Sequence, residues 1–280
     1  MPHAAIIASL PDISRWYADT YTVYHKDIDF NEELRLSALL LMLQETAWNH
    51  ARAIGVDYRR PAFASIIWVL SRMRIEMLGA PPRWMETVKL ATSPTGIDRL
   101  FALRDFLAMH SDGRPFARVA SAWIMIDAAS RRPVRPQSLL DESNFHFETT
   151  VIPEGTEKLK ENPDLTWDSP FCPSYADIDA HQHVNNVSYA QWCLDVPPQE
   201  FFREHSLTSF DINFLAELGW GQAVRIGHSG SVPIDLNPLE SLESQVGLYQ
   251  DFAVQKTGDQ ENAALVRVGW QRRDHAKLQS

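Results

Sequence analysis

Cysteine is almost absent from this chain of 280 residues, which contains only Cys172 and Cys193. Two cysteines cannot build a disulfide framework, so the fold must depend on apolar cores, and the sequence suits a reducing compartment. We therefore expect a cytoplasmic protein. Long apolar runs are missing as well. No stretch approaches the roughly 18 apolar residues that a membrane-spanning helix needs, so we expect no membrane span.

Basic residues are too few to balance the acidic ones: 26 Lys and Arg stand against 36 Asp and Glu, a formal net charge of -10. This deficit argues against a nucleic-acid binder, which normally carries a basic face. Residues 1–12 contain no basic leader, and we interpret them as a mature cytoplasmic start. The hydrophobic content of 45% is enough for the cores of one large domain or two ordinary ones.

An internal repeat indicates two domains. Asp27-Ile28-Asp29 recurs as Asp177-Ile178-Asp179 about 150 residues later, each time after a strand-like stretch and before a helix-like one. Apolar residues at helical spacing predict a helix over 36–54, with Gly55 at its C-cap. Strands are expected at 65–77, 87–93, 99–109, 117–127, 208–216, 222–230, 241–255 and 262–271. This pattern of a helix followed by antiparallel strands, present twice, predicts an α+β fold.

The domain boundaries follow from the loss of periodicity between the repeats. Prolines and charged residues replace the apolar pattern from about residue 131 onward. We expect an N-terminal domain over 1–135, a linker over 136–167 and a C-terminal domain over 168–280.

Acid–base chemistry is concentrated in residues 177–192, DIDAHQHVNNVSYAQW. If this chain were extended, Asp177, Asp179, His181 and His183 would project to one side, because strand side chains alternate between faces. Asn185 or its neighbour would then cap a short helix that ends at Pro197-Pro198. The unpaired backbone N–H groups of residues 184–186 would be able to hold a developing oxyanion.

The segment 177–192 resembles the active-site segment of acyl-[acyl-carrier-protein] thioesterases, and the chain resembles that family elsewhere too. The further similarities are LQETAWNHA at 43–51, IWVLSRM at 67–73 and AWIM at 122–125. The family has two fused hotdog domains, each a long helix wrapped by an antiparallel sheet. Its plant members carry a transit peptide, so the resemblance implies a bacterial-type enzyme here.

The resemblance assigns catalysis to the second domain. It implies roles for Asp179, His183 and Glu217, the last of which lies in DINFLAELG at 211–219. His181 stands where the plant enzymes carry Asn, so it either substitutes for that amide or leaves its role to other groups. Each of these residues also has a structural alternative. Asp179 could cap the helix, His183 could bond to backbone, and Glu217 could be a solvated strand end.

The first domain lacks this chemistry and is expected to bind the acyl chain. Trp68, Phe106, Trp123 and Met125 fall on its strands, where an acyl groove and ordinary core packing are equally good explanations.

The implied function is hydrolysis of fatty acyl-carrier-protein thioesters without a cofactor, through water activated by Asp179 or through an acyl-enzyme anhydride. An acyl-CoA thioesterase and a non-hydrolytic acyl-binding protein remain alternatives. A metal bound by Asp177, Asp179, His181 and His183 is a weaker one, because i, i+2 ligands of one strand rarely complete a coordination shell.

Acyl carrier protein, the implied partner, is acidic. We expect it to bind near the seven arginines between Asp98 and Arg135. Oligomeric state stays open between a monomer and a homodimer.

Overall fold

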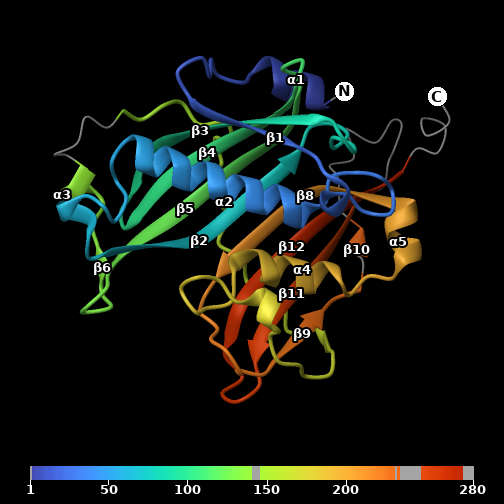
Figure 1. Cartoon of the computed structure of the whole chain (residues 1–280). Coiled ribbons are helices and arrows are strands. Elements are labelled where there is room, and N and C mark those ends of the chain that lie inside the picture. Colours follow the sequence, from blue (N-terminus) through green and yellow to red (C-terminus); the bar gives the residue numbers. More distant parts are fainter. Residues whose placement is uncertain (1, 141–145, 231, 234–246, 274–280) are drawn as a thin grey trace. The chain divides into compact units, whose positions relative to one another are not determined.

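The computed structural model describes residues 2–140, 146–230, 232–233 and 247–273, and the chain divides into two compact units, Met1–Glu157 and Lys158–Ser280. The expected strand at 241–255 therefore lies partly outside the described residues. Each unit is built mainly from antiparallel strands and one principal helix, so the α+β prediction is confirmed (Figure 1). Among the helices of the described ranges, none is long and apolar enough to cross a membrane.

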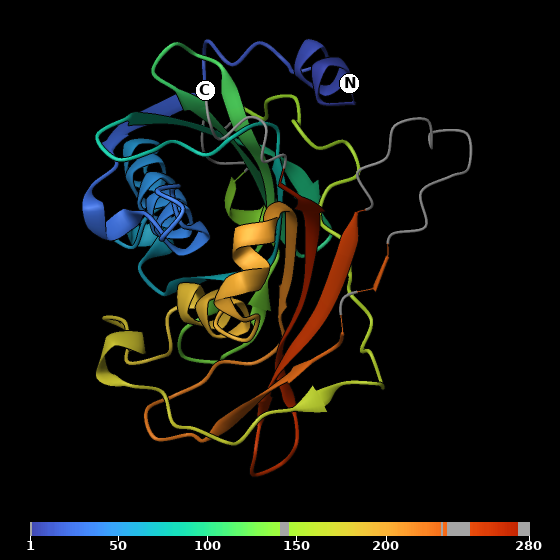
Figure 2. The ribbon, with the colours of Figure 1, turned by 90° about the vertical axis from the view of Figure 1, so that its right-hand side faces the viewer.

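The first unit places helix α2 (Leu36–Ala53) across an antiparallel sheet of order β1-β3-β4-β5-β2, with the short β6 beside β5 (Figure 2). α2 ends where sequence spacing predicts, because Gly55 takes the left-handed conformation with φ 71°. The elements of this unit are α1 (Pro2–Ala8), β1 (Tyr17–Thr22), η1 (His25–Asp27), η2 (Pro61–Phe63), β2 (Ile66–Met77), β3 (Thr87–Asp98), β4 (Phe101–His110), β5 (Pro115–Asp127), β6 (Pro133–Val134) and α3 (Gln137–Leu140).

Both faces of this sheet are covered. On one face, α2 covers the sheet and its Leu43 is fully buried. On the other face, Leu107 and Met109 of β4 pack against Trp16, Val151 and Ile152. Successive residues of a strand point to opposite faces, so β4 supplies both cores. Part of the expected linker, residues 150–152, therefore packs as a strap on the face opposite α2.

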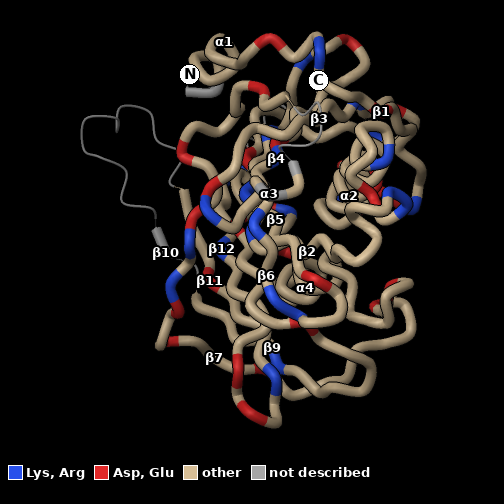
Figure 3. Tube along the Cα trace, turned by 90° about the vertical axis from the view of Figure 1, so that its left-hand side faces the viewer, with Lys and Arg blue, Asp and Glu red and all other residues tan. Residues whose placement is uncertain are grey.

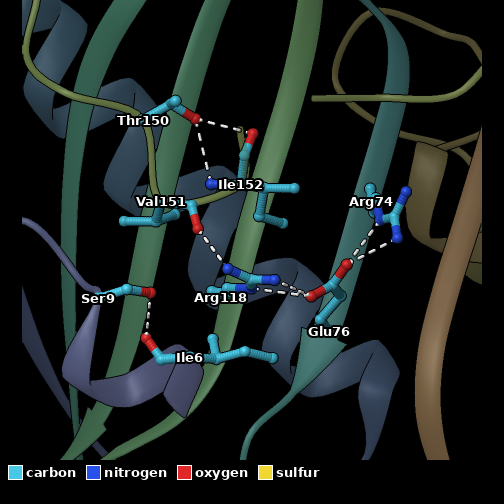
Figure 4. Close-up of polar contacts among 8 residues, drawn as sticks. All are labelled: Ile6, Ser9, Arg74, Glu76, Arg118, Thr150, Val151 and Ile152. Atoms are coloured by element: carbon cyan, nitrogen blue, oxygen red, sulfur yellow. Dashed lines mark hydrogen bonds and ion pairs between the residues drawn. The ribbon is translucent and has the colours of Figure 1, made fainter. Parts of the chain in front are cut away.

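Charged side chains fasten this strap. Arg118 donates to Glu76 Oε2 from Nε and Nη2 at 2.8 and 2.6 Å, and to the Val151 carbonyl at 2.8 Å (Figure 4). On the same face, Asp105 Oδ2 accepts from Val151 N at 2.9 Å and from the Thr150 hydroxyl at 2.6 Å. Burial raises the pKa of Asp105, and these donors oppose that rise. The strap is thus held by buried, directional bonds as well as by apolar packing.

The second unit repeats the plan with a shorter helix, α4 (Asn186–Leu194), which lies with α5 beside strands in the order β8-β12-β11-β9-β7. Helix α4 has half the length of α2. The expected long helix against a sheet is therefore found in the first unit, and the second unit has a short helix in the same place. The elements of this unit are β7 (Thr166–Trp167), η3 (Tyr175–Asp177), α5 (Gln199–Glu204), β8 (His205–Phe214), β9 (Val224–His228), β10 (Val232–Pro233), β11 (Leu248–Lys256) and β12 (Asn262–Arg272).

The end of the expected linker packs on this second unit. Leu159, Leu165 and Trp167 contact Ala253 and Leu265. The Trp167 ring also lies flat on Gly227, where an added Cβ would meet ring atoms at 2.8 Å. Only glycine permits this approach.

Replacing Arg118 by Met should lower the free energy of unfolding by about 2–4 kcal/mol, because Glu76 and the Val151 carbonyl lose a buried charged donor. Urea denaturation followed by fluorescence measures this. Arg114→Met is the control, since its pair with Asp112 is exposed and solvent screening leaves it little effect on stability. Equal effects of the two substitutions would contradict this account of the strap.

Candidate active site

Asp179 organises a tight turn directly before α4. Its Oδ1 accepts from the backbone N–H of His181 at 2.8 Å and of His183 at 3.4 Å, while its own N–H donates to the His183 carbonyl at 2.8 Å. Gln182 occupies the left-handed region with φ 65°. The chain is therefore not extended here, and the alternating arrangement considered for a strand is wrong for this segment. No group among the described residues donates to Oδ2.

The same turn exists in the first unit, 150 positions earlier in the numbering. Asp29 Oδ1 accepts from Asn31 N at 2.7 Å and from Glu33 N at 3.2 Å, and Glu32 has φ 62°. Antiparallel bridges close the two turns in the same way, Ile28 with Leu34 and Ile178 with Val184. One carboxylate oxygen thus has a structural role in both copies. What differs is the chemistry of the side chains that the turn presents.

His183 and Glu217 are brought together by a backbone bridge between His183 and Gly219. His183 Nε2 lies 3.9 Å from Glu217 Oε2, and their side chains are 43% and 38% exposed. This distance is too long for a hydrogen bond, and at this exposure the pair adds little stability.

Tyr189 of α4 also lies at this site, although its residue type and position in the motif gave no sign of it. Its buried hydroxyl donates to the Ala216 carbonyl at 3.4 Å. Burial raises the pKa of Tyr189, and the negative charges of Glu217 and Asp179 raise it further. The phenol therefore stays neutral and lies within electrostatic reach of both carboxylates. The corresponding residue of the first unit is Leu39, also buried.

Two other residues of the motif lie apart from this group. Asp177 turns back and caps η3, accepting from the N–H and hydroxyl of Ser174 at 2.7 Å each. The His181 side chain is exposed, and only its backbone N–H contacts Asp179. Among the described residues, no cluster of three or more His, Cys, Asp or Glu has a geometry that could hold a metal ion.

Most of the backbone N–H groups expected to form an oxyanion hole are already engaged. Val184 N donates to the Leu218 carbonyl at 2.8 Å, and Asn185 N to the Asp177 carbonyl at 2.7 Å. Asn185 Oδ1 caps α4 by accepting from Val187 N at 2.9 Å. In this part of the described chain, the N–H of Asn186 is the remaining donor at the first turn of the helix.

Neither cysteine joins the site. Cys193 is buried on α4, where burial raises the pKa of its thiol, and Cys172 is exposed. A buried thiol in apolar surroundings is a poor nucleophile.

Of the four first-unit residues considered for an acyl groove, Trp68 and Trp123 line a pocket beside α2. Phe106 and Met125 are completely buried in the core instead.

Two units, each with a helix against an antiparallel sheet and the same aspartate-closed turn in front of that helix, define a double hotdog protein. Two family models match the chain: the acyl-ACP thioesterase N-terminal domain over residues 14–142 and the acyl-ACP thioesterase C-terminal domain over residues 160–272. The chain belongs to the acyl-ACP thioesterase family.

Relatives in plants have low but extended similarity. A chloroplastic palmitoyl-acyl carrier protein thioesterase of Gossypium hirsutum is 26% identical over 216 residues, which cover 72% of this chain and 52% of the relative. The chloroplastic oleoyl-acyl carrier protein thioesterase 1 of Arabidopsis thaliana is 28% identical over 234 residues, covering 75% and 63%. The chain thus spans about half the length of several of the curated relatives it matches.

Solved structures share the fold. A putative oleoyl thioesterase from Lactobacillus plantarum superposes with a TM-score of 0.78 at 20% identity, covering 94% of this chain and 99% of that one. An acyl-ACP thioesterase from Bacteroides thetaiotaomicron has a TM-score of 0.76 at 23% identity, covering 90% and 96%.

Asn185→Ala should lower stability by about 1 kcal/mol, because α4 loses its N-cap. Asn186→Ala is the matched control and should change stability by less than about 0.5 kcal/mol, since the Asn186 side chain caps nothing among the described residues. Thermal unfolding of both variants tests this assignment, which fails if Asn186→Ala is the more damaging change.

Proposed function

We propose that this protein hydrolyses fatty acyl-[acyl-carrier-protein] thioesters to free fatty acid and holo-carrier protein. One observation carries the assignment. In this member of the family, Asp179, His183 and Glu217 lie around one turn of the second unit, whereas the matching turn of the first unit has Asp29 but no histidine. Plant relatives named for palmitoyl- and oleoyl-carrier-protein hydrolysis support it. The two unpaired cysteines support a cytoplasmic location.

In the proposed mechanism, Asp179 Oδ2 accepts a proton from water while the water oxygen attacks the thioester carbonyl carbon. Backbone bonds to Oδ1 fix the carboxylate, so Oδ2 has a defined direction. The negative charge that develops on the carbonyl oxygen is stabilised by the N–H of Asn186 and the amino end of α4. When the tetrahedral intermediate collapses, the C–S bond breaks. The thiolate leaves readily because its thiol has a pKa of about 8.5.

The remaining residues position the reactants. Glu217 orients the imidazole of His183, which hydrogen-bonds the attacking water or the departing sulfur. His181 supplies the backbone N–H that holds Asp179, and its exposed imidazole offers a further donor at the rim of the site.

Asp179→Asn should reduce kcat by about 10³-fold, within the range for a general base, and leave folding intact because an amide oxygen can still accept both backbone bonds. Asp29→Asn is the matched control: it makes the same change in the same turn and should retain near-native turnover. Release of free thiol from palmitoyl, oleoyl and octanoyl thioesters of carrier protein and of coenzyme A provides the measurement. Near-native turnover in Asp179→Asn would refute the mechanism. A preference for coenzyme A would point to an acyl-CoA thioesterase.

Acyl carrier protein is proposed to dock on a basic rim at one end of the first unit. Turns and helix ends there surround the apolar cluster of Val56, Phe63 and Met125. The exposed arginines of these turns and helix ends outnumber the acidic residues nearby, which are Asp57, Asp98 and Asp127. Figure 3 faces this end, around β6 and α3. The basic rim consists of Arg52, Arg59, Arg60, Arg99, Arg131, Arg132 and Arg135.

This rim differs from the basic stretch expected from sequence. Three of the seven arginines between Asp98 and Arg135 lie elsewhere. Arg104 lines the pocket, Arg118 is bonded to Glu76, and Arg114 lies in the turn between β4 and β5, at the other end of the sheet.

The double charge reversal Arg99→Glu with Arg132→Glu should lower kcat/KM for carrier-protein substrates about tenfold at low salt, because opposite charges speed encounter. The loss should shrink as salt rises. Arg114→Glu, at the other end of the same sheet, is the control and should have little effect. Equal losses on coenzyme A substrates, measured in parallel, would contradict docking at the rim.

A further inference from the structure

A pocket beside α2 in the first unit contains a cation in otherwise apolar surroundings. The pocket holds about 610 Å³ of space outside protein atoms, part of it open solvent, and three tryptophans, Trp48, Trp68 and Trp123, contribute to its wall. Arg104 is the charged residue among those that line it. A guanidinium would not stabilise a bound chain of hydrocarbon alone, and burying its charge costs free energy.

Only part of the guanidinium is satisfied by the protein. Arg104 Nη1 lies 2.9 Å from His50 Nδ1 and donates to the Thr92 hydroxyl at 3.1 Å. A guanidinium has five N–H donors in a rigid fork. In the ranges that the structure describes, no protein group accepts from Nε or Nη2 of Arg104. The side chain keeps some accessible surface because it faces the pocket.

Neither protein partner neutralises the charge. Arginine has no acceptor, so His50 Nδ1 must accept from it, which makes His50 a neutral imidazole with its proton on Nε2. Burial, and then the positive charge of Arg104, lower the pKa of His50 to about 3. The Tyr17 ring stacks on this imidazole at 5.1 Å and keeps it in place. Thr92 is neutral as well.

No carboxylate compensates Arg104 within the described residues. Asp105 is adjacent in sequence but points to the opposite face of the sheet, where it binds Thr150 and Val151. Burial lowers the pKa of Arg104 to about 10, and no acidic neighbour opposes this shift. The guanidinium nevertheless remains charged at neutral pH. The pocket therefore offers a positive fork of unused donors to whatever occupies it.

We propose that this pocket selects acyl chains that carry an oxygen substituent, and that Arg104 binds that oxygen. A terminal carboxylate fits the fork best, through paired charge-assisted hydrogen bonds, and a hydroxyl or oxo group uses the same donors singly. The tryptophans and neighbouring apolar side chains contact the hydrocarbon part of the chain. This inference rests on the proposed thioester hydrolysis and specifies its substrate class.

Hydrolysis of matched thioesters tests the proposal. Octanoyl, dodecanoyl and palmitoyl carrier-protein thioesters are compared with the same chains bearing a terminal hydroxyl or carboxylate. The native protein should favour an oxygenated chain of the fitting length by about tenfold or more in kcat/KM, the value of one hydrogen bond to a charged group. Arg104→Met should abolish or reverse this preference, and Arg104→Lys should retain part of it. Unaltered preference in Arg104→Met, or none in the native protein, would overturn the proposal.

Binding without turnover separates this inference from the proposed function. Fluorescence of the pocket tryptophans reports binding of fatty acid methyl esters, with and without a terminal hydroxyl or carboxylate, since the ester masks the head group. Selective binding that Arg104→Met removes, in a protein that hydrolyses no thioester, would refute the function and keep the inference. Thioester hydrolysis with no selective binding would do the reverse. Arg114→Met removes an exposed arginine at the other end of the sheet and should keep the selectivity. Loss of selectivity in that variant as well would overturn the assignment to Arg104.

Discussion

The structure depends on one small constraint that occurs twice: a carboxylate oxygen that accepts hydrogen bonds from two backbone N–H groups and so closes a turn in front of a helix. Asp29 and Asp179 make these bonds with nearly the same distances. The turn depends on the aspartate side chain, on a left-handed residue three positions later and on backbone N–H groups. The side chains of the residues that supply those N–H groups, 31 and 33 in the first unit and 181 and 183 in the second, are therefore free to vary. The first unit therefore has the same turn as the second, with Glu33 at the position of His183.

The two copies have diverged around this shared turn. In the first unit, α2 is 18 residues long and forms one wall of a pocket, whereas α4 has nine residues and carries a buried tyrosine within electrostatic reach of Asp179 and Glu217. Leu39 and Tyr189 occupy corresponding positions on these helices, so one substitution separates a purely apolar contact from a polar one. The two copies thus differ in the side chains that a common backbone plan carries.

Buried charge serves two purposes on strands β4 and β5. Asp105 and Arg118 face the strap, where every bond they make is to protein, and they hold residues 150–152 in place. Arg104 is adjacent to Asp105 but faces α2, and part of its hydrogen-bonding capacity is directed to the pocket. The alternation of a strand thus places Asp105, which binds the strap, and Arg104, which faces the pocket, side by side in sequence on opposite faces of one sheet.

The sequence by itself determined the α+β class, the helix over 36–54 with its glycine cap, most of the strands and the family, whose motif includes residues 177–192. These features follow from local periodicity, turn chemistry and a family motif, which need no knowledge of distant contacts. Only the tertiary structure decided that Asp177 is a cap, that Val184 and Asn185 have already used their N–H groups, and that Tyr189 joins the site. It also decided that Arg104 faces the pocket and that Arg118 is buried against Glu76 and the strap. Each of these outcomes depends on which faces and loops meet across long sequence separations, and a charged residue has the same local pattern whether it reaches solvent, a strap or a pocket.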